Sequence, residues 1–333
     1  MSDEKVLIIA EIGVNHNGNI DIAKKLIDAA KESGADIVKF QTAKLDSLVS
    51  NNADMADYQK RNIGAEKSQK EMLRELLLPF EDFRELADYC HETGIRFLST
   101  PFDVESVRFL NNLQGIWKIP SGEITNYPYL VEIAHTHKDI ILSTGMSTLD
   151  DVEAAIELLN AEGSGGITLL HCTTDYPASM ADVNLNAMLT LKKEFNLPVG
   201  YSDHTRGMEV SIAAVAMGAT VIEKHFTLDR SMIGPDHKAS LEPNELKALV
   251  SAIRNVEMAR GSFDKQPTQN EIKNRSIARK SIVAAKDIKK GEKFSAENLT
   301  TKRPGNGISP MLWNQVIGKA AIKDFCEDDL IEI

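Results

Sequence analysis

Two lysines and two histidines stand at or near the ends of short apolar runs, where residues of these types can bind ions. Lys39 and Lys118 each interrupt an otherwise apolar run, and His204 and His225 each come at the end of one. Ammonium groups bind phosphate and carboxylate, whereas neutral imidazoles are common ligands of divalent cations. A single residue of this kind is more often a surface charge or a satisfied core group. The combination predicts a site that holds an anionic substrate beside a metal ion.

Hydroxyl-bearing and acidic residues occur at the same run ends. Hydroxyl groups near lysines suit an anion that carries both phosphate and carboxylate, and carboxylates can act as general bases beside an open metal site. Gln41 and Thr174 close two of the runs, and Tyr176 stands in a loop just beyond one, where it can touch a substrate. The hydroxyl residues are Thr100, Ser121, Ser143 and Ser202, and the acidic residues are Glu11, Glu123 and Asp236.

These residues must be positioned by eight repeats of one pattern, a short apolar run followed by a stretch with helical spacing of apolar residues. Eight strand–helix units are what an α/β fold of the (β/α)8 or TIM barrel type requires, and that fold places its chemistry at the carboxyl ends of the strands. His204 and His225 would then end neighbouring strands. The runs are residues 6–11, 35–42, 95–100, 115–123, 139–145, 167–174, 198–204 and 220–226.

Helix signals and one insertion complete the predicted barrel. The first helix is predicted from about Ile20 to Ser33 with Gly34 as its stop signal, and the last from Pro243 to Arg260 with one apolar face. Residues 43–79 form a longer insertion between the second and third predicted strands, rich in Asn, Gln and charged residues. It is either a loop that reaches over the barrel mouth or solvated helical filler, and the sequence favours neither.

The composition of the sequence changes after the predicted barrel, which we place at residues 1–261. Residues 262–276 are polar and lack periodicity, as a linker does. Residues 277–333 have short apolar pieces among Gly and Pro, typical of a small, irregular, β-rich domain. Arg303 stands beside the RPGNG turn of this domain, where an isolated arginine is ordinarily a surface residue.

The composition predicts a soluble cytoplasmic protein. A net charge of -11 argues against a nucleic-acid partner, because phosphate backbones require a concentrated cationic surface. The three cysteines are odd in number and far apart, so no disulfide framework is expected and a reducing compartment fits. No apolar run approaches the roughly 18–20 residues that a membrane span needs, which predicts no membrane partner.

Ten short motifs spread over the chain carry a family resemblance. They are AEIGVNHNG (10–18), KFQT (39–42), FLSTPFD (97–103), KIPSGE (118–123), STGM (143–146), HCTTDYP (171–177), SDHT (202–205), EKHFT (223–227), GPDH (234–237) and KRPGNGISP (302–310). In this order they resemble the sialic acid synthase family, which makes nonulosonic acids. Residues 277–333 resemble the antifreeze-like (SAF-type) domain of that family.

The resemblance implies a transferase that condenses phosphoenolpyruvate with an N-acetylated mannose-type sugar. The products would be a nine-carbon 2-keto acid and phosphate, formed with cleavage of the C–O bond of phosphoenolpyruvate. The resemblance also implies a divalent metal ion, Mn or Mg. A domain-swapped homodimer is implied as well, in which the antifreeze-like domain caps the barrel of the partner.

The motifs also transfer roles to individual residues. Lys39, Thr100, Lys118, Ser121, Ser143 and Ser202 would hold phosphoenolpyruvate. His204 and His225 would bind the metal, with Glu11 near it through water. Gln41, Tyr176, Glu123 and Asp236 would line the sugar and reaction site, and Glu11 or Glu123 would take the proton from the attacking water. Arg303 would reach across the dimer to the acetamido group of the sugar, which replaces its interpretation as a surface residue.

One position departs from the sialic acid synthase pattern. Those enzymes commonly have Asn where this chain has Thr174, a residue expected to contact substrate. The segments HCTTDYPA, GYSDHTRG (200–207) and SGEITNYPYL (121–130) resemble more closely the legionaminic acid synthases of the same family. These act on 2,4-diacetamido-2,4,6-trideoxymannose to give N,N'-diacetyllegionaminic acid, and the shorter Thr side chain fits that bulkier, less hydroxylated sugar.

Three alternative functions remain open from the sequence. The first is sialic acid synthase proper, which uses N-acetylmannosamine. The second is another phosphoenolpyruvate-dependent barrel synthase acting on an aldose phosphate, which would need further cations for the second phosphate. The third is an ice- or glycan-binding C-terminal domain on a barrel scaffold, but a scaffold has no need of lysines, histidines and hydroxyls at successive strand ends.

Overall fold

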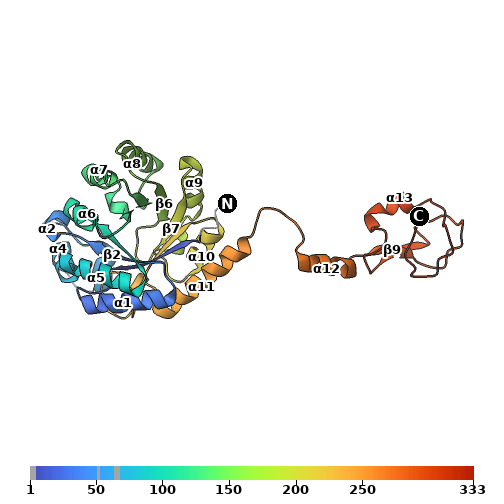
Figure 1. Ribbon diagram of the computed structural model, residues 1–333, viewed down its shortest axis with the longest axis horizontal. Coiled ribbons are helices and arrows are strands. Elements are labelled where there is room, and N and C mark those ends of the chain that lie inside the picture. The colour runs from blue at the N-terminus through green and yellow to red at the C-terminus, as the bar shows by residue number, and fades with distance from the viewer. Residues whose placement is uncertain (1–4, 51–52, 64–67) are drawn as a thin grey trace. The chain divides into compact units, whose positions relative to one another are not determined.

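A computed structural model describes residues 5–50, 53–63 and 68–333 of the chain (Figure 1). It confirms the predicted TIM barrel followed by a small β-containing domain. The chain divides after Gly261 into two compact units. Each unit has its own hydrophobic core and is described by itself.

The barrel is a single sheet of parallel strands. The strand order is β3-β2-β1-β8-β7-β6-β5-β4, and β3 contacts β4, so that the sheet closes on itself. The strands are β1 (Leu7–Gly13), β2 (Ile37–Thr42), β3 (Arg96–Pro101), β4 (Ile116–Ile119), β5 (Asp139–Ser143), β6 (Ile167–Cys172), β7 (Val199–Asp203) and β8 (Val221–His225).

Helices surround this sheet (Figure 1). The predicted first helix is confirmed: Asn19 caps its start by accepting a hydrogen bond from the Ile22 amide, and Gly34 ends it at φ +88°. The predicted last helix is also confirmed, and it buries Leu246, Leu249 and Ile253. The helices are α1 (Ile20–Ser33), α5 (Phe80–Thr93), α6 (Val104–Leu110), α7 (Tyr127–Ala134), α8 (Leu149–Ala161), α9 (Asn186–Phe195), α10 (Glu209–Ala216) and α11 (Pro243–Arg260).

The two-residue period of the strands places polar side chains in the mouth of the barrel. Six buried apolar residues fill the lower interior: Ile9, Ile37, Leu98, Ile141, Leu170 and Val221. Two residues further along the same strands come Glu11, Lys39, Thr100, Ser143, Cys172 and Glu223. Successive side chains on a strand face opposite sides, so each of these residues lies one layer above an apolar neighbour. The apolar layer thereby closes the floor of the barrel under a polar layer.

The insertion over residues 43–79 is helical and contributes to the barrel mouth. Its described parts form α2 (Leu45–Leu48), α3 (Asp57–Ile63) and α4 (Gln69–Leu76), whereas residues 51–52 and 64–67 lie outside the described residues. The Asn62 side-chain amide donates to the carbonyl oxygen of Pro235 at 2.6 Å and to that of Tyr176 at 3.4 Å. These bonds tie α3 to two loops at the carboxyl ends of the strands. The sequence left two interpretations of the insertion open, a loop over the barrel mouth or solvated helical filler. The structure shows that the described part of the insertion covers the mouth.

The second unit contains a helix that the sequence analysis did not predict. Helix α12 (Gln269–Ala278) begins inside the segment expected to be a linker, because Thr268 and Glu271 form a capping box at its start. It buries no residue, so it has no apolar periodicity by which to be recognised. The antiparallel strands β9 (Ser281–Ala284) and β10 (Leu299–Lys302), with α13 (Trp313–Val316), surround a core that includes Ile282, Phe294, Leu299, Val316 and Phe325. Within the described ranges of both units, no helix is long and apolar enough to cross a bilayer.

Candidate active site

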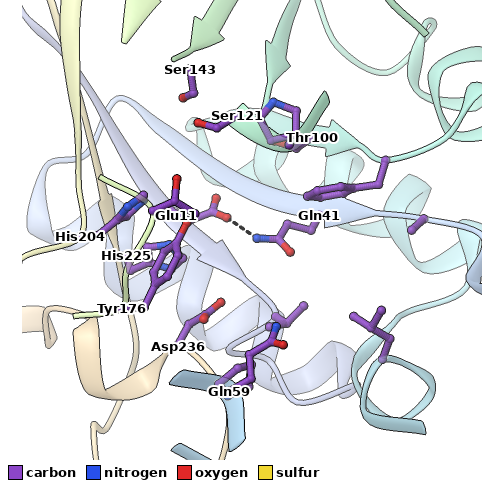
Figure 2. A pocket seen from close by; sticks show the side chains of 18 of the residues that line it. Glu11, Gln41, Gln59, Thr100, Ser121, Ser143, Tyr176, His204, His225 and Asp236 are labelled. Atoms are coloured by element: carbon purple, nitrogen blue, oxygen red, sulfur yellow. Dashed lines mark hydrogen bonds between the residues drawn. The ribbon is translucent and has the colours of Figure 1, made fainter. Parts of the chain in front are cut away.

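A cavity of about 380 Å³ opens at the carboxyl ends of the barrel strands (Figure 2). Strand ends form one part of its lining and the insertion forms another. All the predicted site residues of the barrel except Glu123 line this cavity: Glu11, Lys39, Gln41, Thr100, Lys118, Ser121, Ser143, Thr174, Tyr176, Ser202, His204, His225 and Asp236. Residues from all eight strands, or from the loops that follow them, thus meet in one space.

Two lysines and two glutamates form a buried charge cluster at the base of the cavity. Lys39 Nζ lies 2.8 Å from Glu11 Oε2 and 3.7 Å from Glu223 Oε2, and Lys118 Nζ lies 3.8 Å from Glu223 Oε1. The Ser202 hydroxyl donates to Glu223 Oε1 at 3.0 Å. Glu223 was not among the site residues predicted from the sequence. It lies two residues before His225 on a predicted strand, so its side chain must face the same side of the sheet as that of His225.

The surroundings shift the pKa values of the two lysines in opposite directions. Burial disfavours the charged form of Lys39, but the carboxylates of Glu11 and Glu223 outweigh it and raise the pKa above its ordinary value. Burial lowers the pKa of Lys118, which the attraction of Glu223 only partly offsets. For Glu223, burial is outweighed by Lys118 and Lys39, which lower its pKa. Lys39 is therefore a fixed cation, whereas Lys118 has the weaker charge compensation and gains most from an incoming anion.

Hydrogen-bond donors gather beside Lys118. Its amine donates to the Ser143 hydroxyl at 2.7 Å, and the Gly145 amide donates to the Ser121 hydroxyl at 2.9 Å. A β-carbon on Gly145 would lie 2.5 Å from Thr174 Oγ1, so any larger residue at this position would displace side chains of the site. Thr174 Oγ1 is itself buried, and no described residue gives it a hydrogen bond. This group of donors can satisfy the oxygens of a phosphate or a carboxylate.

The two histidines lie together on the opposite side of the cluster. Their ring centroids are 5.5 Å apart, and the ring of Tyr176 lies 4.2 Å from His204 and 5.5 Å from His225. Burial lowers the pKa of His204 to about 4 and holds that of His225 well below its ordinary value, so both rings are neutral, which is the form that binds metals. The Nδ1 atom of His204 lies 2.7 Å from the Thr173 carbonyl oxygen, and Nδ1 of His225 is buried without a hydrogen-bond partner among the described residues.

The donor set fits an open metal site. Among the described residues no three His, Cys, Asp or Glu side chains form a complete metal cage. Two neutral histidines, one with an unsatisfied ring nitrogen, with Glu11 beside them can supply part of a coordination sphere, and water or substrate oxygens would supply the rest. That arrangement is the one used by metals that act on substrates.

Carboxylates on the histidine side have raised pKa values. Gln41 donates to Glu11 Oε1 at 2.9 Å, as the dashed line in Figure 2 shows. Burial raises the pKa of Glu11 although Lys39 opposes it. Burial, and then the charge of Glu11, raise the pKa of Asp236 to about 7. A carboxyl group with the pKa of Asp236 can accept or release a proton near neutral pH.

Two predicted residues lie outside this cavity. The carboxylate of Glu123 accepts a hydrogen bond from the Asn126 side chain at 2.6 Å, and burial raises its pKa. Arg303 belongs to the second unit, where its Nε donates to the Ala278 carbonyl oxygen at 3.0 Å. Their roles in catalysis and sugar binding stay predictions.

The chain matches two known families along most of its length. Residues 26–265 match the NeuB family, and residues 279–332 match the SAF domain. It is 56% identical to the N,N'-diacetyllegionaminic acid synthase of Campylobacter jejuni over 98% of this chain and 99% of that one. It is 50% identical to the enzyme of the same name from Legionella pneumophila over 93% of this chain and 89% of the other.

A solved structure agrees with these matches. The N-acetylneuraminic acid synthetase of Leptospira borgpetersenii is 33% identical and superposes with a TM-score of 0.72, covering 81% of this chain and 90% of that one. The fold, the cavity and the near full-length identities agree, and the chain belongs to the NeuB family.

Proposed function

We propose that the protein condenses phosphoenolpyruvate with 2,4-diacetamido-2,4,6-trideoxymannose to give N,N'-diacetyllegionaminic acid and phosphate. The observation that carries this proposal is the cavity in which two lysines and several hydroxyls lie next to two neutral histidines. The sugar follows from the relatives, because identity is 56% and 50% to two legionaminic acid synthases but 33% to a sialic acid synthetase.

The charge cluster would bind phosphoenolpyruvate. Its phosphate and carboxylate carry several negative charges, which Lys39 and Lys118 neutralise in a space closed to water at its base. Ser143, Ser121 and the Gly145 amide supply neutral donors to the same oxygens. Because these groups are fixed before the substrate arrives, little reorganisation is needed, and such preorganised positioning can contribute several kcal/mol to catalysis.

His204 and His225 would hold a divalent cation, Mn or Mg, with Glu11 near it. When bound, this ion supplies Lewis acidity to the aldehyde oxygen of the open-chain sugar. The chain contributes the neutral state of both rings, which burial enforces, and the orientation of His204 through the Thr173 carbonyl.

The proposed reaction forms one carbon–carbon bond and breaks one carbon–oxygen bond. The methylene carbon of phosphoenolpyruvate attacks the aldehyde carbon, and the aldehyde oxygen gains a proton to become a hydroxyl group. Water adds to the resulting cationic carbon, and Glu11 accepts its proton. The tetrahedral intermediate then expels phosphate with the bridging oxygen, and the proton of its new hydroxyl group passes to the departing phosphate, which leaves the 2-keto acid. We assign the base to Glu11 rather than Glu123, because Glu11 lines the cavity.

Two further parts of the proposal rest on the family resemblance. We propose a cytoplasmic, domain-swapped homodimer in which Arg303 of one chain binds the acetamido group of the sugar in the partner's barrel. The molar mass in solution tests the dimer, because a value near the 36.7 kDa of one chain would rule it out.

Phosphate release with a set of sugars tests the activity. We expect the diacetamido trideoxy sugar to be used with a kcat/KM at least about tenfold above that of N-acetylmannosamine. A preference for N-acetylmannosamine would favour the alternative of a sialic acid synthase, and no phosphate release with either sugar would refute the condensation. With labelled bridging oxygen in phosphoenolpyruvate, the label must appear in phosphate, since its retention in the sugar acid would contradict C–O cleavage.

A further inference from the structure

The cavity has two unlike sides. The side formed by the strand ends carries the lysines, hydroxyls, carboxylates and histidines described above. The side formed by the insertion is mainly hydrocarbon. We call this second side the apolar wall, and its members are Leu48, Val49, Met72, Leu73, Leu76 and Leu77.

The apolar wall is supported by a small core of its own. Met72 and Leu76 are buried together with Val14 and Met55, and Ile63 and Leu73 pack against this cluster. The cluster is distinct from the main barrel core. Asn62 ties the same helical segment to the Pro235 and Tyr176 carbonyl oxygens. The wall is therefore a packed surface with a fixed place over the cavity.

Several wall side chains remain partly exposed. Leu48, Leu73 and Leu77 are only half-buried although each lines the cavity. Gln59 and Gln69 are the polar side chains that the described part of the insertion adds to this lining. In Figure 2 Gln59 lies with Asp236 on the side of the cavity away from Ser121 and Ser143. A ligand anchored at the charge cluster would direct its far end toward hydrocarbon with few hydrogen-bond partners.

A hydrocarbon surface with few hydrogen-bond partners suits a methyl group better than a hydroxymethyl group. Burying a methyl group against it is favourable, whereas moving a hydroxyl from water to a site without a hydrogen-bond partner is unfavourable. The phosphate, the carboxylate and the reacting aldehyde all require the polar side of the cavity. The opposite, deoxygenated end of the sugar is the part that matches the wall.

We infer that the apolar wall of the insertion determines sugar specificity by contacting the C6 methyl group of a 6-deoxy sugar. This inference rests on the proposed function, and it assigns the selection of the sugar to Leu73 and Leu77 in addition to residues of the barrel. The relevant chemistry is the absence of a C6 hydroxyl, independent of the number of acetamido groups.

Two sugars that differ only at C6 test this inference. They are 2,4-diacetamido-2,4,6-trideoxymannose and its 6-hydroxy counterpart, 2,4-diacetamido-2,4-dideoxymannose, each assayed by phosphate release with saturating phosphoenolpyruvate. We expect the native protein to favour the 6-deoxy sugar at least about tenfold in kcat/KM. Leu73→Asn and Leu77→Asn should each lower that preference about fivefold or more, because an amide can pair with the hydroxyl.

Ile63→Asn is the matched control. Ile63 packs against the same small cluster as Leu73 but does not line the site cavity. It should lower the thermal midpoint about as much as Leu73→Asn while leaving the sugar preference at the native value. An equal kcat/KM for the two sugars in the native protein would overturn the inference, as would an equal change of preference in Ile63→Asn and Leu73→Asn. Failure of both sugars to release phosphate would instead refute the proposed function.

Discussion

Strand β8 carries an acidic and a basic residue next to each other, Glu223 and Lys224, and the surroundings of the two side chains differ. Glu223 faces the inside of the barrel and lies 3.7 Å from Lys39 and 3.8 Å from Lys118. Lys224 faces the surrounding helices and pairs with Asp203 at 3.0 Å, and neither side chain of this outer pair is exposed at all. Two buried lysine–carboxylate systems thus occupy opposite faces of the same strand.

The outer pair is satisfied by its neighbours, whereas in the inner cluster only Lys39 has a close carboxylate, Glu11 at 2.8 Å. Asp203 accepts hydrogen bonds from the Thr205 amide and hydroxyl and from the Ser211 hydroxyl, and Lys224 donates to the Thr205 carbonyl oxygen at 2.6 Å. The inner ammonium groups lie near a cavity, at distances from Glu223 that exceed a hydrogen bond. Buried charges that have every partner stabilise a fold, and charges held apart beside a cavity are available to a ligand.

The largest effect on stability is expected from Lys224→Met. This change leaves the Asp203 carboxylate buried without its cation, which costs about 3–5 kcal/mol of unfolding free energy. Urea denaturation measures the loss. The KM for phosphoenolpyruvate should change little, because Lys224 faces away from the cavity. An undiminished unfolding free energy would show that the outer pair is not structural.

The double variant Lys224→Met with Asp203→Leu separates the cost of the unpaired carboxylate from the cost of altered packing. It removes both charges, so most of the lost stability should return. If the double variant is as unstable as Lys224→Met alone, the cost lies in packing rather than in the unpaired carboxylate.

The same substitution on the inner face, Lys118→Met, should act on activity instead. Loss of this cation and of its bond to Ser143 should reduce kcat/KM for phosphoenolpyruvate about 100-fold or more, which corresponds to roughly 2.7 kcal/mol. The unfolding free energy should fall less than in Lys224→Met, because removing a desolvated amine relieves part of the cost of burying it. Steady-state kinetics and urea denaturation of both variants provide the measurement, and equal stability losses would erase the distinction between the two faces.

The strand pattern made most of the barrel and its mouth predictable. Apolar runs ending in polar residues located the strands, and the period of two then placed Lys39, Thr100 and Ser143 in one layer above Ile37, Leu98 and Ile141. The period of two also places Glu223 inside the barrel. Its neighbours in the sequence, one apolar and one basic, did not mark it as a site residue. Only the structure shows that it lies between the two lysines.

Other features depended on contacts between distant segments. The polar composition of residues 43–79 concealed the apolar wall, because Leu73 and Leu77 are separated by charged residues that face outward. Helix α12 carries no buried residue and so left no periodic pattern in the sequence. Glu123 is four residues beyond the end of β4, and the short 3₁₀ turn there takes its carboxylate to Asn126 rather than into the cavity lining.

The smallest effect concerns Asp236, a buried carboxyl group that forms no ion pair with a lysine of the described residues. Burial raises the pKa of Asp236 from 3.8 to about 7, so the folded protein binds this proton more tightly than the unfolded chain does. Its contribution to stability is therefore complete below about pH 4 and is lost as the pH rises through 7. Between pH 5 and 6 the loss is about 1.4 kcal/mol for this one group. Asp236→Asn cannot ionise, so the difference in unfolding free energy between it and the native protein should change by that amount over this interval. A constant difference across these pH values, measured by urea denaturation, would contradict the raised pKa. It would show that Asp236 stays ionised because a cation lies close to it, as Lys224 lies close to Asp203.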